Sequence, residues 1–195
     1  MGQLLKCMTE WSGCWRPAHV GRYLGYRLLF VGWLLAPVSA WSSETGLRIA
    51  FVYNFLKFIE WPALSDGAPV NLCVFQARNE LRELLKDISR RQHPRPIQVF
   101  FLDDVNQVNS TLSGCHLAYM PLTGEEIPLP EELPPGVVLV ADEAPLSDGR
   151  IAIILQRNAE SRIEFLINTQ AINHAGVSVS SQLLKLAKNH KGANG

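Results

Sequence analysis

The side chains best suited to chemistry in this 195-residue sequence include three of its adjacent acid pairs, Asp103-Asp104, Glu125-Glu126 and Asp142-Glu143. The first two pairs stand at the starts of expected helices, where carboxylates cap the helix and favour its dipole, so we interpret them as structural. Asp142-Glu143 directly follows an apolar run, residues 137–141, that predicts a buried strand. Because ligands of open parallel sheets bind beyond the carboxyl ends of the strands, Asp142 and Glu143 are our candidate ligand-binding residues.

The sequence contains none of the common catalytic motifs. A Gly-x-Ser-x-Gly nucleophile elbow, a His-Glu-x-x-His zinc motif and a Gly-x-Gly-x-x-Gly loop are all absent. The cysteines and histidines show no zinc-ligand spacing, and adjacent strand residues such as Cys115 and His116 point to opposite faces. The sequence therefore predicts a protein without a metal, a cofactor or an enzymatic activity.

An export signal is predicted at the N-terminus. Arg22 and Arg27 precede an uncharged apolar run, residues 28–38, and small residues follow it up to Ala40. A basic flank, a short apolar core and a small-x-small exit are typical of a secretory signal peptide. The run is shorter than the roughly 20 apolar residues that a membrane-spanning helix needs. We therefore expect residues 1–40 to be a signal peptide that is cleaved after Ala40.

Removal of residues 1–40 changes both the charge and the cysteine content. The full sequence has 18 basic and 18 acidic side chains; four basic and one acidic side chain leave, so 14 and 17 remain, for a net charge of −3. This mild negative charge gives no electrostatic footprint for nucleic acid, which we exclude as a partner. Of the four cysteines, only Cys73 and Cys115 remain. In an exported chain they predict one disulfide, with two buried free thiols as the alternative.

Four apolar runs predict the strands of a mainly parallel sheet, at residues 70–75, 97–102, 115–120 and 137–141. Because these runs do not alternate with polar residues, the strands should be buried on both faces, with helices on both sides of the sheet. A helix that Trp61-Pro62 ends is apolar around most of its circumference and should be largely buried. We expect an α/β fold, with a single domain over residues 41–188 and a polar tail over residues 189–195.

The last third of the sequence departs from this pattern. Residues 151–156 and 162–167 are apolar runs joined by a short connection, which predicts an antiparallel hairpin. Arg162, Glu164 and Asn168 alternate along one face of its second strand and its exit. Charges on an edge strand usually protect it from pairing, but they also mark protein-contact faces, so these residues are our candidate partner-binding surface. Such an edge could also pair with a second copy of the chain.

Five blocks of the sequence resemble the YfiR-like family of periplasmic proteins. They occur in the family's order, and the resemblance covers residues 47–187. The blocks are AFVYNFLKFIEWP at 50–62, LCV at 72–74, CHLAY at 115–119, RIEFLIN at 162–168 and AGVSVSSQLLKLA at 175–187. Each block is short, and their combination carries the resemblance.

The resemblance implies a periplasmic regulator that is not an enzyme. Members of this family look like repressors that bind the periplasmic sensor part of an inner-membrane diguanylate cyclase and so lower cyclic di-GMP. An OmpA-type outer-membrane lipoprotein can sequester such a repressor. The best-known member has a second cysteine pair in its last third, whereas residues 140–153 of this sequence contain no cysteine. The alternatives are a periplasmic small-ligand-binding receptor and an accessory protein of a sensor kinase or a transporter.

Overall fold

The computed structural model describes residues 44–90, 93–122, 128–145 and 147–188. These residues all belong to the second of two compact units, Ser42–Gly195. The predicted signal peptide, the acid pair Glu125-Glu126 and the polar tail lie outside the described residues. Among the helices that are described, none is both long enough and apolar enough to cross a membrane.

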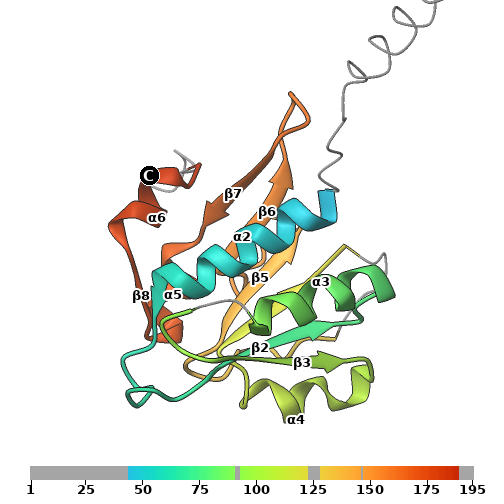
Figure 1. Ribbon diagram of the computed structural model, residues 1–195. Coiled ribbons are helices and arrows are strands. Elements are labelled where there is room, and N and C mark those ends of the chain that lie inside the picture. The colour runs from blue at the N-terminus through green and yellow to red at the C-terminus, as the bar shows by residue number, and fades with distance from the viewer. Residues whose placement is uncertain (1–43, 91–92, 123–127, 146, 189–195) are drawn as a thin grey trace, which may run out of the picture. The chain divides into compact units, whose positions relative to one another are not determined.

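Six strands form one sheet in the order β3-β2-β4-β5-β6-β7, and their arrangement confirms the predicted fold class (Figure 1). Five strands run parallel, and β7 runs antiparallel to β6, so the hairpin in the last third is also confirmed. The strands are β2 (Val70–Phe75), β3 (Ile97–Leu102), β4 (Leu117–Met120), β5 (Val138–Asp142), β6 (Ile153–Arg157) and β7 (Ile163–Ile167).

Two strand boundaries differ from the prediction in ways that matter for the site. Cys115 and His116 precede β4, because the Cys115 N–H donates to the Leu112 carbonyl in a turn at the end of the preceding helix. Strand β5 is shifted by one residue, from the predicted 137–141 to 138–142, so that Asp142 is its last member and pairs with Leu155 of β6. The carboxylate of Asp142 is thus held by the sheet itself and does not belong to a loop.

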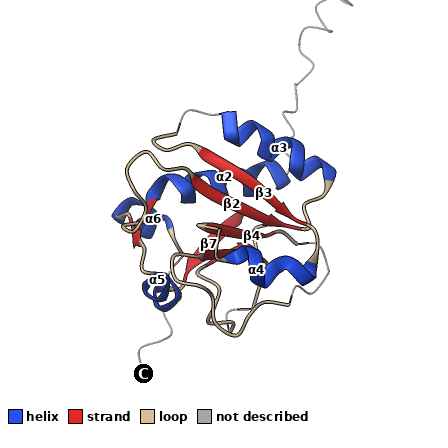
Figure 2. Cartoon of the chain, turned by 90° about the horizontal axis from the view of Figure 1, so that it is seen from below, coloured by secondary structure: helices blue, strands red, loops and turns tan. Residues whose placement is uncertain are grey.

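Helices cover both faces of the sheet, as Figure 2 shows. The helices α2 (Glu44–Phe58) and α3 (Asn79–Arg90) pack on one face, together with buried residues of α5 (Thr169–Ala175) and α6 (Ser181–Leu186). The other face is covered by α4 (Val108–Leu112), which follows the short 3-10 helix η2 (Val105–Gln107). Each face has its own apolar core, because the side chains of each buried strand alternate between the two faces.

Helix α2 buries five of its fifteen residues, so it is less buried than predicted, and it ends at Phe58 instead of at Trp61-Pro62. The next two residues form β1 (Ile59–Glu60), which pairs antiparallel with β8 (Ser178–Val179). The Ser180 N–H also donates to the Phe58 carbonyl, at 2.9 Å. Residues 58–60 thus form hydrogen bonds with residues 178–180 instead of a further turn of α2.

The strand order creates a topological switch point between β2 and β4. The chain leaves β2 to form β3 on one side of it, and then crosses to form β4 on the other side. Connections that leave neighbouring strands in opposite directions open a crevice at the carboxyl ends of those strands, where ligands of doubly wound sheets bind.

Candidate functional site

A cavity of about 290 Å³ lies at this switch point. Its walls come from the first turn of α2, from the start of α3 after β2, and from the ends of β4 and β5. The lining residues are Glu44, Thr45, Arg48, Arg78, Glu80, Leu81, Tyr119, Pro121, Leu122 and Asp142. Asp142, one of the two predicted ligand-binding residues, therefore lines this cavity.

Arg48 of α2 is the centre of the charged cluster beside this cavity. It is only 6% exposed, and its guanidinium donates to Glu44 Oε1 at 2.8 Å and to Glu143 Oε1 at 2.5 Å. It also donates to the Leu155 carbonyl at 3.3 Å, and its Nη1 lies 3.3 Å from Asp142 Oδ1. One arginine thus joins α2 to the end of β5 and to the middle of β6.

Asp142 is held in this cluster from two sides. Its Oδ2 accepts hydrogen bonds from the Tyr119 hydroxyl at 2.9 Å and from the Leu122 N–H at 3.4 Å. Its Oδ1 is buried and has the ion pair with Arg48 but no hydrogen bond within the described residues. The side chain is 3% exposed, so this carboxylate depends on Arg48 for compensation of its charge.

Burial dominates the protonation equilibria of the cluster. It raises the pKa of the Asp142 carboxyl, and the charge of Arg48 and the hydrogen bond from Tyr119 offset part of this rise. Burial also raises the pKa of the Tyr119 hydroxyl, and the nearby charge of Asp142 raises it further. Both effects favour a protonated Tyr119 hydroxyl, in keeping with its hydrogen bond to Asp142.

Glu143, the second predicted ligand-binding residue, does not line the cavity but links the cluster to the hairpin. Its backbone has a φ of 50°, a left-handed conformation that is unusual for a residue other than glycine. Its N–H donates to the Leu155 carbonyl at 2.8 Å, and its Oε1 accepts from the Arg157 N–H at 3.0 Å. Arg157 also forms an ion pair with Glu44, the first residue of α2, so the hairpin is connected to this helix as well.

The predicted partner-binding residues have three different environments. Arg162 is exposed at the start of β7, and its N–H donates to Asn158 Oδ1 in the hairpin turn. Glu164 is half-buried and accepts hydrogen bonds from Gln156 and Asn158. Asn168 caps α5 by accepting from the N–H groups of Gln170 and Ala171. Of the three, Arg162 is the exposed side chain, and the other two stabilise the hairpin and the helix.

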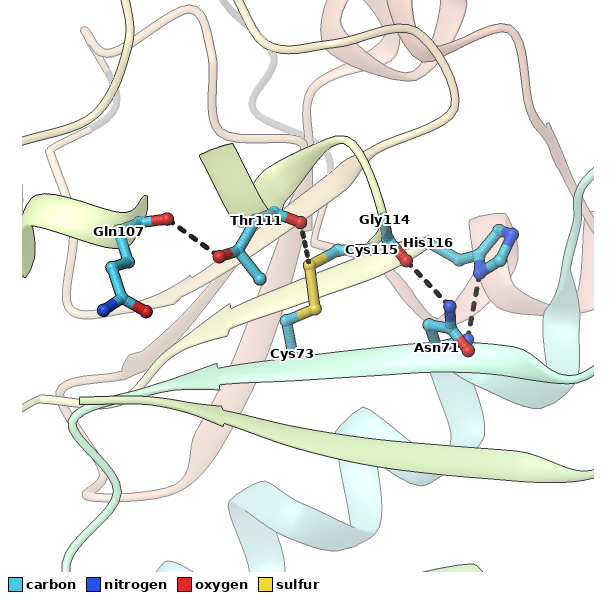
Figure 3. Close-up of a disulfide and its surroundings, with 7 residues drawn as sticks. All are labelled: Asn71, Cys73, Gln107, Thr111, Gly114, Cys115 and His116. Carbon is cyan, nitrogen blue, oxygen red and sulfur yellow. Dashed lines mark hydrogen bonds between the residues drawn. A yellow bond between two sulfur atoms is a disulfide. The ribbon is translucent and has the colours of Figure 1, made fainter. Parts of the chain in front are cut away.

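The predicted disulfide joins Cys73 of β2 to Cys115, with a Cα–Cα distance of 5.7 Å (Figure 3). Beside it, Asn71 Nδ2 donates to the Gly114 carbonyl at 2.8 Å, and the Asn71 N–H donates to His116 Nδ1 at 2.9 Å. Burial lowers the pKa of His116, in keeping with a neutral ring that accepts at Nδ1. The adjacent Cys115-His116 pair therefore has two structural roles. Within the described residues, no group of three His, Cys, Asp or Glu side chains could hold a metal ion.

Sequence reasoning missed Arg48, Glu44, Tyr119 and Arg157. In the sequence, Arg48 is one of the few polar residues of the apolar helix that precedes Trp61-Pro62. It is spaced four residues before the buried Val52 and seven before the buried Phe55, which places it on the buried face of α2. A charge at such a position requires a buried partner, and this was the signal available in the sequence.

Comparison with known proteins agrees with the resemblance that the sequence blocks carry. A family model described as YfiR/HmsC-like matches residues 45–188, which include nearly all of the described domain. No curated protein matches the sequence significantly.

Proposed function

Because the chain belongs to the YfiR/HmsC-like family, we propose that it binds the periplasmic sensor part of an inner-membrane diguanylate cyclase and represses the enzyme, lowering cyclic di-GMP. The family is one of periplasmic regulatory proteins without catalytic activity. The extent of the match carries the proposal, since it runs from the second residue of α2 to the residue after Ala187. A regulator of this kind acts by occupying a surface of its partner.

The proposal includes export to the periplasm, with residues 1–40 as a signal peptide that is cleaved after Ala40. The Cys73–Cys115 disulfide supports this location, because such bonds persist mainly in oxidising compartments. Sequestration by an OmpA-type outer-membrane lipoprotein would relieve the repression by competing for the repressor.

We assign the cyclase contact to the β6–β7 hairpin, with Arg162 as its exposed charge. Glu164 and Asn168 stabilise this surface, since their side-chain oxygens accept hydrogen bonds within the hairpin and at the start of α5. Glu164→Lys would remove hydrogen bonds within the fold as well as a surface charge. Arg162→Glu is therefore the cleaner variant for testing the contact.

Cyclic di-GMP should be measured in cells that lack the gene and in cells complemented with wild type, Arg162→Glu or Arg90→Glu. Arg90 is an exposed arginine at the end of α3 and provides a matched charge reversal elsewhere. We expect deletion and Arg162→Glu to raise cyclic di-GMP, while wild type and Arg90→Glu restore repression. If deletion leaves cyclic di-GMP unchanged, the repressor function is wrong. If deletion raises cyclic di-GMP but Arg162→Glu represses as well as wild type, only the assigned surface is wrong.

A small-ligand receptor is the second candidate, and the cavity at the switch point is the observation that favours it. Its polar groups converge from α2, β4 and β5, as in ligand sites that fix a ligand's orientation. A screen of small molecules by thermal shift tests this function. A compound that raises the melting temperature of wild type, but not that of Glu80→Leu, would support a receptor.

A further inference from the structure

The floor of the cavity at the switch point is formed by the buried side chains of Asp142 and Tyr119. The Asp142 side chain is 3% exposed, and the groups that contact its carboxylate belong to Arg48, Tyr119 and Leu122, which all line the same cavity. Its Oδ1 has no hydrogen bond within the described residues. The Tyr119 hydroxyl donates its proton to Oδ2, which leaves the lone pairs of the Tyr119 oxygen as acceptors. The floor thus offers oxygen acceptors to a ligand.

The charged cluster beside this floor contains more carboxylates than guanidinium groups. Arg48 contacts Glu44, Asp142 and Glu143, and Arg157 forms an ion pair with Glu44. Three acids therefore share two arginines. Burial raises the pKa of Asp142 in spite of the nearby Arg48 charge, so the ionised carboxylate is incompletely compensated. A positive charge in the cavity would compensate it.

Two charges of opposite sign lie at the rim of the cavity. Glu80 belongs to the first turn of α3, and Arg78 directly precedes this helix. Both residues are exposed, so water and salt screen their charges, and their effects on a charge inside the cavity oppose each other. The sign of a preferred ligand therefore depends mainly on the buried acids.

We propose that this cavity binds a small organic cation, a protonated amine with an apolar body. The ammonium group donates toward Asp142 and Tyr119, and the apolar body contacts Leu81, Pro121 and Leu122 in the cavity wall. A carboxylate in the same place would lie against the excess of acids, and a neutral alcohol would leave the buried charge uncompensated. The proposal rests on the small-ligand receptor function and names the chemical class of its ligand.

A second cavity, of about 340 Å³, provides an internal comparison. It is lined in part by residues that precede β5 and β6, and its acids Glu131 and Glu132 are exposed. Its arginine, Arg150, is paired with Asp148 at 2.7 Å. None of the described residues that line it is a buried carboxylate. A cation that acids attract in general would enter both cavities, whereas the proposed ligand selects the cavity with Asp142.

Isothermal titration calorimetry of the full-length gene product, purified as the cell processes it, tests the ligand class. The probes are phenethylamine, 2-phenylethanol and phenylacetate, which share a phenyl ring and a chain of two carbons but differ in charge. Butylamine, butanol and butyrate form a second series with a smaller body. In at least one series, we expect the amine to bind about tenfold or more tightly than the alcohol and the carboxylate, a difference of about 1.4 kcal/mol.

Variants of the floor and the rim test where the amine binds. Asp142→Asn removes the buried charge and should weaken amine binding about tenfold. The exposed rim provides variants that leave the core intact: Glu80→Gln should weaken amine binding about threefold, and Arg78→Gln should strengthen it by a similar factor. Glu132→Gln, in the second cavity, is the matched control and should leave amine binding unchanged.

The proposal is overturned if the amines of both series bind no more tightly than the matched alcohols and carboxylates. It is also overturned if amine binding is the same in wild type, Asp142→Asn, Glu80→Gln and Arg78→Gln. The receptor function is judged separately, by the thermal-shift screen. A neutral or anionic compound that stabilises wild type through this cavity would retain the receptor function and overturn the cationic ligand.

Discussion

Replacing Arg48 with methionine should lower the free energy of unfolding mainly because it leaves a buried carboxylate without its counter-charge. The Arg48 and Asp142 side chains are 7% and 3% exposed, so water compensates neither charge well. Removal of one partner from a buried ion pair typically costs about 3–5 kcal/mol. Methionine retains most of the aliphatic volume, so the packing of α2 against the sheet contributes little to the loss.

The loss should depend on pH with a definite sign. The folded-state pKa of Asp142 is already raised by burial in wild type, and loss of the Arg48 charge raises it further. A carboxyl with a raised folded-state pKa contributes its stability below the unfolded-state pKa, near 3.8, and loses it as the pH rises through the folded-state pKa. The deficit of Arg48→Met relative to wild type should therefore be largest at neutral pH and shrink on acidification.

Urea unfolding of wild type, Arg48→Met, Asp142→Asn and the double variant at neutral and acidic pH measures this effect. In the double variant no buried charge remains at this pair, and the asparagine oxygen can still accept from Tyr119, so most of the loss should be recovered. The coupling between two such contacting residues should be about 1–3 kcal/mol. The reasoning is refuted if the deficit of Arg48→Met does not change with pH, or if Asp142→Asn recovers none of it.

Three further predictions concern the rest of the domain. Replacing Cys73 and Cys115 with alanine should lower the free energy of unfolding by about 4 kcal/mol in urea, the chain-entropy value for a separation of 42 residues; a loss below about 1 kcal/mol would contradict the entropic estimate. Burial lowers the pKa of His116, so the contribution of this residue to stability is present above pH 6.5 and is lost as the pH falls through the folded-state pKa. His116→Asn should therefore reduce the loss of thermal stability on acidification, as measured by thermal unfolding. Asn168→Ala should cost about 1 kcal/mol in the same urea assay, since it removes the cap of α5, and an unchanged midpoint would argue against that role.

The parallel strands could be predicted closely because their apolar runs are bounded by polar residues and prolines. The predicted runs at 70–75 and 97–102 coincide with β2 and β3. Asn168 and Gly176 delimit α5 through local chemistry, the former as a side-chain cap and the latter with a φ of 67° that favours glycine. These features depend on local sequence, where periodicity and capping chemistry act directly.

The pairing of β1 with β8 could not be predicted, because strands of two residues leave no periodic signal. Ile59 and Val179 are 120 positions apart in the chain, and only the folded domain brings them together. The charged cluster around Arg48 also depends on contacts between residues that are far apart in the sequence. Asp142 was found from its place after an apolar run, but its dependence on Arg48 results from the packing of α2 across the sheet.

The disulfide makes a covalent ring of the chain between Cys73 and Cys115, and this ring contains α3, β3 and α4. A protease that cuts one of the connections inside the ring would therefore release no fragment from the oxidised protein. The two pieces would stay joined through the sulfur atoms and would separate on a denaturing gel only after reduction. A nicked molecule could keep its edge strand in place, so that limited proteolysis without reductant would underestimate how often this part of the domain opens.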